Sequence, residues 1–511
     1  MERRVFLQMV AGCGVGALAG PASTVLARET TAPAYFGLHP FIEAHPEAVF
    51  IRMTGVASKS ESEAKKSAGL AFADRIFSLR DTPGIPLSHK FAIKPNLTAA
   101  SGMGTANAIV TDSFVVEGFV ESVKKLGIPA GQIYLREGLM VSQPGVGYVE
   151  LAQRTGAHYG DEDSRTPVTR ECPDGVVFRR TKYLGPFNYP DSYLINIAKF
   201  KSHAMGLTLC VKNLQGTNIR PYIRFCGGIQ EAIADDFQPD AQAHVEALYR
   251  KHLQAGMPRW DTEKGEWMEM WIQRTIDHYS LIKPNIGLNI IEGVFGQNGN
   301  GFNHGPGPEA MPDIFMTNML IFGKDAFNVD VIGHWLGGHE PGNFGLFHIG
   351  RERGVSTALN PANIPVYLWE DSGPKLAPLN RLKRTPLSTL YLAKSGETQY
   401  HMCDEPFTYP AETSSACLSG GEKPGFQVLG VNRPASGPSS LVVEYNLPAD
   451  AHASLEMYNS AGDRVGVLAR GRQPTGVHAA EWNTQRAAAG VYVCRMKADG
   501  LDQRRRITLA G

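Results

Sequence analysis

Short apolar runs alternate with amphipathic helical segments from about residue 47 to residue 400. The apolar runs indicate buried strands and the segments between them indicate crossover helices, so the pattern favours an α/β domain with a mostly parallel sheet and flanking helices. Sheets of this kind bind ligands at the carboxyl ends of their strands. Polar residues that follow the predicted strands are therefore the first candidates for a functional site.

The strands and helices expected in this domain follow from apolar periodicity and from capping residues. The predicted strands are FAIK (91–94), QIYLREG (132–138), DSYLINIAK (191–199), NIGLNIIEG (285–293) and TNMLIFG (317–323). Residues 111–127 predict a helix capped by Thr111 or Asp112, and residues 325–338 predict another that begins at Asp325. Asp330, further along that helix, is expected to pair with a nearby cation.

The segment KFKSHAMGLTLCVKNLQG places three lysines and a histidine around a predicted strand and the turn after it. Its strand is predicted to end near Lys199, with Lys199 and Lys201 on one face and His203 continuing into the loop. Lys212 and Asn213 follow about one helical segment later. Lysine ammonium groups attract carboxylates and phosphates, so the group predicts an anion site. The alternative is that these lysines are solvated residues at a strand end.

Other predicted strands end in similar polar residues. A turn at Pro95 can present Lys94 and Asn96 to a ligand. Glu137 and Glu292 could act as general acid or base, or bind a divalent metal together with His203 and Asp325. The residues assigned to catalysis are Lys201, His203, Glu137 and Glu292, and those assigned to ligand binding are Lys94, Asn96, Lys199, Lys212, Asn213 and His304.

His304 lies in the glycine- and asparagine-rich segment FGQNGNGFNHGPGPE (295–309). Its backbone donors and flexibility suit a loop that closes over a ligand, and a plain surface loop is the alternative. Neither a P-loop nor a dinucleotide-binding glycine fingerprint accompanies it, so nucleotide binding by those loops is not predicted.

The net charge and the cysteine content limit which partners and cofactors are expected. Fifty Lys and Arg residues balance fifty Asp and Glu residues, which is not the charge of a protein that binds mainly nucleic acid phosphates. Seven cysteines without a CxxC pair argue against an iron–sulfur cluster. A small anionic molecule is the expected partner, a divalent metal is a candidate cofactor, and the cofactor itself is not identified.

The N-terminal stretch MERRVFLQMVAGCGVGALAGPASTVLARE has the composition of an export signal. Arg3 and Arg4 match a twin-arginine signal over residues 1–27, with cleavage after Ala27. Lipid attachment at Cys13 is the less favoured alternative. The mature chain is expected to be periplasmic or extracellular and to have no transmembrane segment.

The C-terminal part of the chain predicts a second folded unit. After residues 28–400, residues 401–425 have a linker composition, and residues 426–511 alternate polar and apolar positions as a small β-sandwich does. The motifs YNLP, MYNSAGDRV, GVHAAEWN and AGVYVCRM resemble the immunoglobulin-like module of the flagellar hook-capping protein and of type IX sorting domains. That resemblance implies attachment or spacing, not catalysis.

The α/β domain also has a family resemblance. IKPNL, TDSFVVEGFVESVKKLG, LINIAKFKSHAMGLTLCVKNLQG, IKPNIGLNIIEGVFGQNGNG and GKDAFNVDVIGHWLGG resemble, in order, the blocks of the family called domain of unknown function 362, over about residues 47–355. Some members carry ferredoxin clusters, whose cysteines are absent here, and Glu292 stands where the family usually has Asp. The resemblance implies a shared fold and site, and no reaction.

These features predict an exported protein that is an enzyme acting on a small anionic molecule. The alternative is a non-catalytic anion-binding or redox-accessory protein that docks through its β-sandwich. The sequence carries no motif that assigns a reaction type.

Overall fold

The computed structural model describes most of the α/β domain and of the C-terminal strands. The described residues are 35–81, 84–97, 108–138, 146–160, 167–203, 206–223, 231–257, 265–298, 313–385, 387–389, 401–402, 407–409, 427–432, 440–447, 450–459, 463–474, 476–485, 487–488, 490–498 and 501–509. The predictions for the signal peptide, Cys13 and His304 lie outside these ranges, as does most of the predicted linker.

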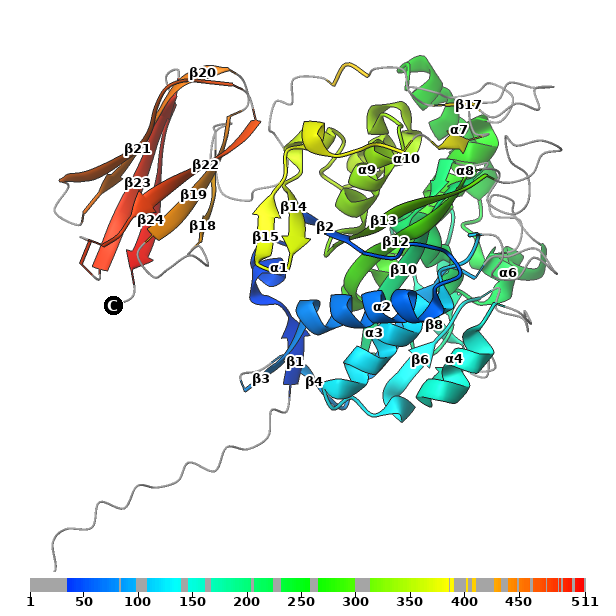
Figure 1. Ribbon diagram of the computed structural model, residues 1–511. Coiled ribbons are helices and arrows are strands. Elements are labelled where there is room, and N and C mark those ends of the chain that lie inside the picture. The colour runs from blue at the N-terminus through cyan, green and yellow to red at the C-terminus, as the bar shows by residue number, and fades with distance from the viewer. Residues whose placement is uncertain are drawn as a thin grey trace, which may run out of the picture.

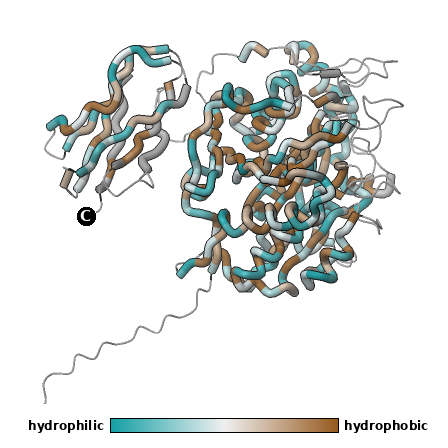
Figure 2. The backbone as a smooth tube through the Cα atoms, in the orientation of Figure 1, coloured by the Kyte–Doolittle hydropathy of each residue, from teal (hydrophilic) through white to brown (hydrophobic). Residues whose placement is uncertain are grey.

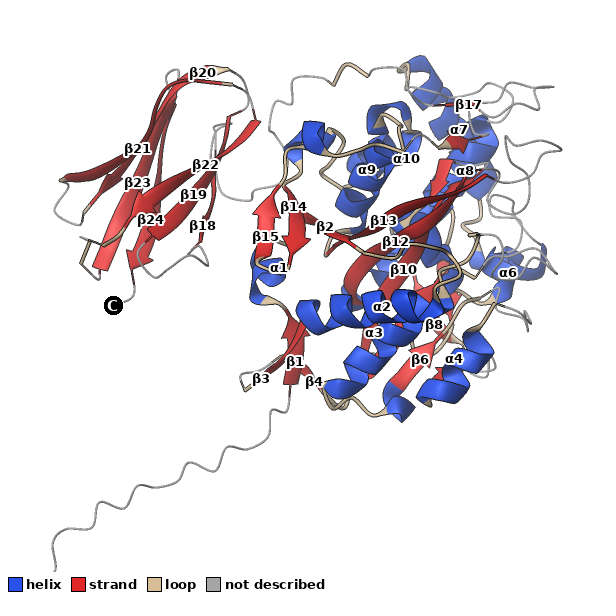
Figure 3. Ribbon diagram, viewed as in Figure 1, coloured by secondary structure: helices blue, strands red, loops and turns tan. Residues whose placement is uncertain are grey.

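A ten-stranded sheet forms the centre of the α/β domain (Figure 3). Its order is β15-β14-β2-β13-β12-β10-β5-β6-β7, and β11 pairs with β10. The strands are β2 (Val49–Met53), β5 (Lys90–Pro95), β6 (Ile133–Leu135), β7 (His158–Tyr159), β10 (Ser192–His203), β11 (Gly206–Thr208), β12 (Ile286–Asn298), β13 (Asp313–Gly323), β14 (Val366–Glu370) and β15 (Gly373–Leu376). The run from β12 through β10, β5 and β6 to β7 is parallel, whereas β13 is antiparallel to both of its neighbours.

The α/β class and a strand in each of the five predicted segments are confirmed. Several boundaries are wrong: β12 continues past Glu292 to Asn298, β13 begins at Asp313, β6 ends at Leu135, and β10 does not end near Lys199 but continues to His203. The extension occurs because β11 turns back along the end of β10 and pairs with it antiparallel, with Lys201 opposite Thr208 and His203 opposite Gly206. Lys201 and His203 are therefore strand residues, and His203 is not in a loop.

Helices cover both faces of the sheet (Figure 1). On one face lie α2 (Ser62–Ile76) and α3 (Ser113–Lys125), and on the other lie α8 (Gly265–Ile282) and α9 (Ala326–Leu336). Alternate residues of each strand join different cores: Ile195 packs with the α2 and α3 residues, and Leu194 packs with the α8 and α9 residues. Hydrophobic residues accordingly concentrate at the middle of the domain (Figure 2).

Both predicted helix caps are confirmed. The Asp112 carboxylate accepts hydrogen bonds from the backbone N–H groups of Phe114 and Val115 at the start of α3. The Asp325 carboxylate accepts one from the backbone N–H of Asn328 at the start of α9, at 3.0 Å.

The remaining elements of this part of the chain are short or peripheral. They are α1 (Pro40–Ala44), α4 (Tyr148–Thr155), α5 (Cys210–Asn213), α6 (Arg220–Ile223), α7 (Ala241–Gln254), α10 (Gly345–Glu352), β1 (Tyr35–Leu38), β3 (Phe77–Arg80), β4 (Ile85–Pro86), β8 (Val168–Glu171), β9 (Arg180–Tyr183), β16 (Ser388–Thr389) and β17 (His401–Met402). A 3-10 helix, η3 (Leu214–Thr217), directly follows α5.

The C-terminal strands form two antiparallel sheets. One contains β18 (Gln427–Asn432), β19 (Ser440–Leu447) and β22 (Gly476–Asn483), and the other contains β20 (Ala451–Tyr458), β21 (Arg464–Gln473), β23 (Gly490–Ala498) and β24 (Leu501–Leu509). Val443 and Tyr445 of the first sheet share one apolar cluster with Leu455 and Met457 of the second. Across the described ranges of the whole chain, every helix is too short or too polar to span a membrane.

Candidate functional site

Four parallel strands of the sheet end at the same edge. Because β6, β5, β10 and β12 run in one direction, the residues that follow or end them are brought together there. Each of these strands contributes a charged side chain to the edge, and the predicted residues Glu137, Lys94, Lys199 and Glu292 are all buried. The alternative of solvated lysines is therefore wrong for Lys199 and Lys201, whereas Lys212 is only half-buried.

Lys94, on β5, forms a buried ion pair with Glu137, which follows β6. The two side chains are 0% and 2% exposed, and Lys94 Nζ donates to Glu137 Oε2. The same ammonium group donates to Asn213 Oδ1 at 3.0 Å and to the carbonyl oxygen of Pro95 at 2.6 Å. Burial lowers the pKa of Lys94, and the charge of Glu137 opposes this effect. Glu137 thereby offsets much of the cost of a buried ammonium group.

A chain of asparagine side chains holds this ion pair against α5. Asn213 Nδ2 donates to Asn196 Oδ1 at 2.8 Å, and Asn196 Nδ2 donates to Asn289 Oδ1 at 2.9 Å. Asn96 Nδ2 donates to Asn213 Oδ1 at 3.1 Å. Asn96 and Asn213 were predicted to bind a ligand, whereas Asn196 and Asn289 were missed. Their signal in the sequence is an amide inside an otherwise apolar strand.

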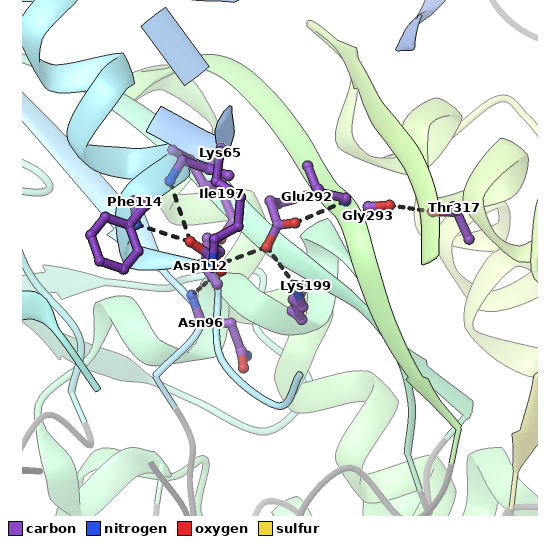
Figure 4. A network of polar contacts seen from close by, with 12 residues as sticks. Lys65, Asn96, Asp112, Phe114, Ile197, Lys199, Glu292, Gly293 and Thr317 are labelled. Carbon is purple, nitrogen blue, oxygen red and sulfur yellow. Dashed lines mark hydrogen bonds and ion pairs between the residues drawn. The ribbon is translucent and has the colours of Figure 1, made fainter. Parts of the chain in front are cut away.

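Lys199, on β10, forms the second ion pair, with Glu292 on β12 (Figure 4). Lys199 Nζ lies 2.6 Å from Glu292 Oε2, and the same oxygen accepts a hydrogen bond from the backbone N–H of Asp112 at 3.0 Å. The carboxylate of Asp112 in turn lies 2.7 Å from Lys65 Nζ on α2. Lys65 was missed because a lysine in an amphipathic helix resembles an ordinary surface residue in the sequence.

The two ion pairs lie on opposite faces of the sheet. Lys94 alternates with Ile93, so it faces the α8 and α9 side with Ala92, and Lys199 faces the α2 and α3 side with Ile197. They approach one another only where the strands end. Lys201, two residues beyond Lys199, is at this point and interacts electrostatically with residues of both pairs.

Lys201 and His203 are in a buried and strongly cationic environment. Burial, then Lys212, then Lys199 lower the pKa of Lys201 well below its usual value, against a smaller opposing effect of Glu137. Burial, Lys212 and Lys201 likewise lower the pKa of His203. The neighbouring lysines lower the pKa values of Lys201 and His203, and the negative charge of an anion bound beside them would raise these pKa values again. The electrostatics of the edge therefore favour a negatively charged ligand.

The position of Lys212 depends on Asp330, for which the prediction of a cation partner is wrong. The Asp330 carboxylate accepts hydrogen bonds from the backbone N–H groups of Cys210 at 2.7 Å and Val211 at 2.8 Å. These are the first two residues of α5, which carries Lys212. Burial raises the pKa of Asp330 to about 8. The side chain anchors α5 because its two oxygens face two backbone donors that lack helical partners.

Replacing Asp330 with Ala should lower the free energy of unfolding by about 2–4 kcal/mol, because two buried N–H groups lose their acceptors. Asp325→Ala, on the same helix, is the matched control, and loss of an ordinary cap should cost about 1 kcal/mol. Urea unfolding of both variants measures the difference. Equal losses would show that Asp330 does not anchor α5.

The proposed metal ligands do not come together. Because β13 is antiparallel to β12, the end of β13 at Gly323 pairs near the start of β12 at Asn289. Asp325 therefore lies at the opposite edge of the sheet from Glu292. Within the described ranges, no group of three or more His, Cys, Asp or Glu side chains is arranged to hold a metal ion.

The fold and this edge define an α/β protein with a buried lysine and carboxylate cluster at its strand ends. Residues 91–334 match the family model described as "Domain of unknown function (DUF362)", which supports the resemblance of the main domain. The matched residues include every predicted site residue and exclude the C-terminal sheets, whose resemblance to the hook-capping module stays a prediction. No curated protein matches the chain.

Proposed function

We propose that the chain is an exported enzyme that binds a small anionic substrate at the strand-end cluster. The observation that supports the proposal is that lysines outnumber carboxylates among the described side chains that are buried or half-buried at this edge of the sheet. Four buried lysines and two half-buried ones interact electrostatically here with three carboxylates: the lysines are Lys65, Lys94, Lys199 and Lys201, then Lys59 and Lys212, and the carboxylates are Asp112, Glu137 and Glu292. A bound anion would offset the excess positive charge, which costs free energy when it is buried.

The cluster also has groups that can move protons. Because burial and the neighbouring lysines lower the pKa of Lys201, this lysine gives up its proton more readily than an exposed one, and His203, whose pKa is lowered in the same way, is a second group that can exchange a proton. Perturbed lysine and histidine groups at strand ends are typical of active sites in α/β proteins. Lys201 and His203 are therefore the proposed acid–base residues, with Glu137 and Glu292 holding the adjacent lysines in place.

Lys201→Ala and His203→Ala should each weaken anion binding about tenfold to a hundredfold, the value of one charge-assisted hydrogen bond. Calorimetry against phosphates, carboxylates and divalent metals measures this. Because an anion should restore the lowered pKa of Lys201, wild-type binding should take up protons, and the observed enthalpy should vary with the buffer.

The matched control is Lys375→Ala, a lysine whose side chain is 61% exposed on β15, which should leave binding unchanged. If wild type, Lys201→Ala and His203→Ala bind every anion alike, the cluster is not a ligand site.

The alternative is a non-catalytic anion-binding or redox-accessory protein that docks through a C-terminal immunoglobulin-like β-sandwich. The shared apolar cluster of the two C-terminal sheets supports a sandwich. Metal and cofactor analysis of the folded, exported protein discriminates between the two functions. A stoichiometric organic cofactor or metal favours the enzyme, and their absence together with anion binding favours the accessory protein.

We also propose twin-arginine export to the periplasm or the cell exterior, on the basis of Arg3 and Arg4. Replacing both with Lys should trap the precursor in the cytoplasm, as measured by fractionation and immunoblotting. Normal export of this double variant would contradict the twin-arginine route.

A further inference from the structure

Two polar side chains flank Lys201 in the sheet without hydrogen-bond partners of their own. In the register of the strands, Lys201 is opposite Thr208 of β11 on one side and opposite Gln297 of β12 on the other. Thr208 is 1% exposed and Gln297 is 0% exposed. Within the described part of the chain, the Thr208 hydroxyl and both polar atoms of the Gln297 amide have no hydrogen-bond partner.

Orphaned polar groups of this kind are rare in folded proteins. Nearly all buried side-chain polar atoms are hydrogen-bonded, because removal from water without a partner is costly. Here three such atoms lie on the two strands that flank a buried lysine. Side chains directly opposite one another in a sheet point to the same face and lie within contact distance. Thr208, Lys201 and Gln297 therefore form a row across three strands.

We propose that this row binds the phosphate group of the substrate, either as inorganic phosphate or as a phosphate monoester. The inference rests on the anion-binding function proposed above and names its ligand class. The Lys201 ammonium, the Gln297 amide N–H and the Thr208 hydroxyl each donate to a different phosphate oxygen. When the ligand is hydrogen phosphate, the Gln297 carbonyl oxygen accepts from its one remaining hydroxyl group, and in a monoester dianion the ester oxygen takes that place without a hydrogen bond to Gln297.

Charge and geometry favour phosphate over a carboxylate. A carboxylate has two oxygens in one plane, whereas the row offers three donors from three strands. Phosphate also carries more negative charge than a carboxylate, so it offsets the positive charge of the described lysines of the cluster more fully. Lysine is a common phosphate ligand for the same electrostatic reason.

Calorimetric titration of the full chain with inorganic phosphate, phenyl phosphate and acetate tests the proposal. Wild type should bind at least one of the two phosphates about tenfold or more tightly than acetate. Gln297→Glu places a carboxylate in the row at almost constant volume, and it should weaken phosphate binding about a hundredfold or more. Thr208→Val should weaken it about tenfold. Gln254→Glu, the same change at an exposed position of α7, should have no effect.

The two phosphate probes identify the source of the group, because tighter binding of phenyl phosphate indicates an ester and tighter binding of inorganic phosphate indicates the free ion. Gln297→Met and a thermal melt of each variant separate a folding defect from a binding defect. The phosphate proposal is overturned if wild type prefers acetate, or if folded Gln297→Met and Thr208→Val bind phosphate like wild type. In either case, anion binding that is lost in Lys201→Ala leaves the proposed function standing, whereas no anion binding by wild type overturns both.

Discussion

Replacing Glu137 with Gln should lower the free energy of unfolding by about 3–5 kcal/mol, because it leaves the ammonium group of Lys94 buried without its carboxylate. Both side chains are almost fully buried, so water cannot solvate the ammonium group of Lys94 once the carboxylate is gone. Lys94 also holds Asn213, and through it the asparagine chain, so the loss should extend to α5. Urea unfolding monitored by far-ultraviolet circular dichroism measures the change.

Two comparisons make this prediction specific to a buried charge. The double variant Lys94→Met with Glu137→Met removes both charges at similar volume and should recover most of the lost stability. Glu370→Gln breaks the exposed ion pair between Glu370 and Lys375 and should cost at most about 1 kcal/mol. A double variant that is as unstable as Glu137→Gln would contradict the role assigned to the ion pair.

Replacing Gly216 with Ala should cost about 3 kcal/mol or more and should also weaken anion binding. A Cβ atom at this position would lie 2.1 Å from Glu137 Oε1 and 2.4 Å from Lys94 Cε. Neither side chain has room to retreat, because both are buried and joined to one another. The 3-10 helix η3 would therefore have to move away from the strand ends, which disturbs both the packing and the site.

Gly55→Ala is the matched control, because a Cβ atom there would have no neighbour within 4 Å. It should be neutral or slightly stabilising, since it only restricts the unfolded chain. Unfolding and anion titration of the two variants give the comparison. Gly216→Ala with wild-type stability and binding would show that η3 does not constrain the ion pair.

The sequence predicted which residues come to the strand-end cluster better than it predicted the contacts that these residues make. Strand periodicity placed Lys94, Glu137, Lys199 and Glu292 after apolar runs, and the structure brings all four to this side of the sheet, although β10 and β12 continue beyond Lys199 and Glu292. It could not match Lys94 with Glu137, or Lys199 with Glu292, since these pairs depend on which strands are neighbours. The pairing of strands is a long-range property that local periodicity does not contain.

Three further points depend on pairing that local periodicity does not show. The end of β10 was misplaced because the short strand β11 pairs with it and extends the ladder to His203. Asp325 was predicted to cap a helix, with metal binding as an alternative; the cap is confirmed, and the antiparallel direction of β13 takes Asp325 away from Glu292. The role of Asp330 was missed because its partners, two backbone N–H groups, lie about 120 residues earlier in the chain.

The central claim is that the strand-end cluster is a buried anion site, and an anomalous diffraction experiment tests it most directly. Crystals of the mature chain grown with arsenate, a phosphate analogue, would locate the bound anion from the arsenic signal. We expect one strong peak within hydrogen-bond distance of Lys201 Nζ, between Thr208 and Gln297, that disappears in Lys201→Ala. Arsenate found only on exposed lysines, with none at the cluster, would contradict this claim.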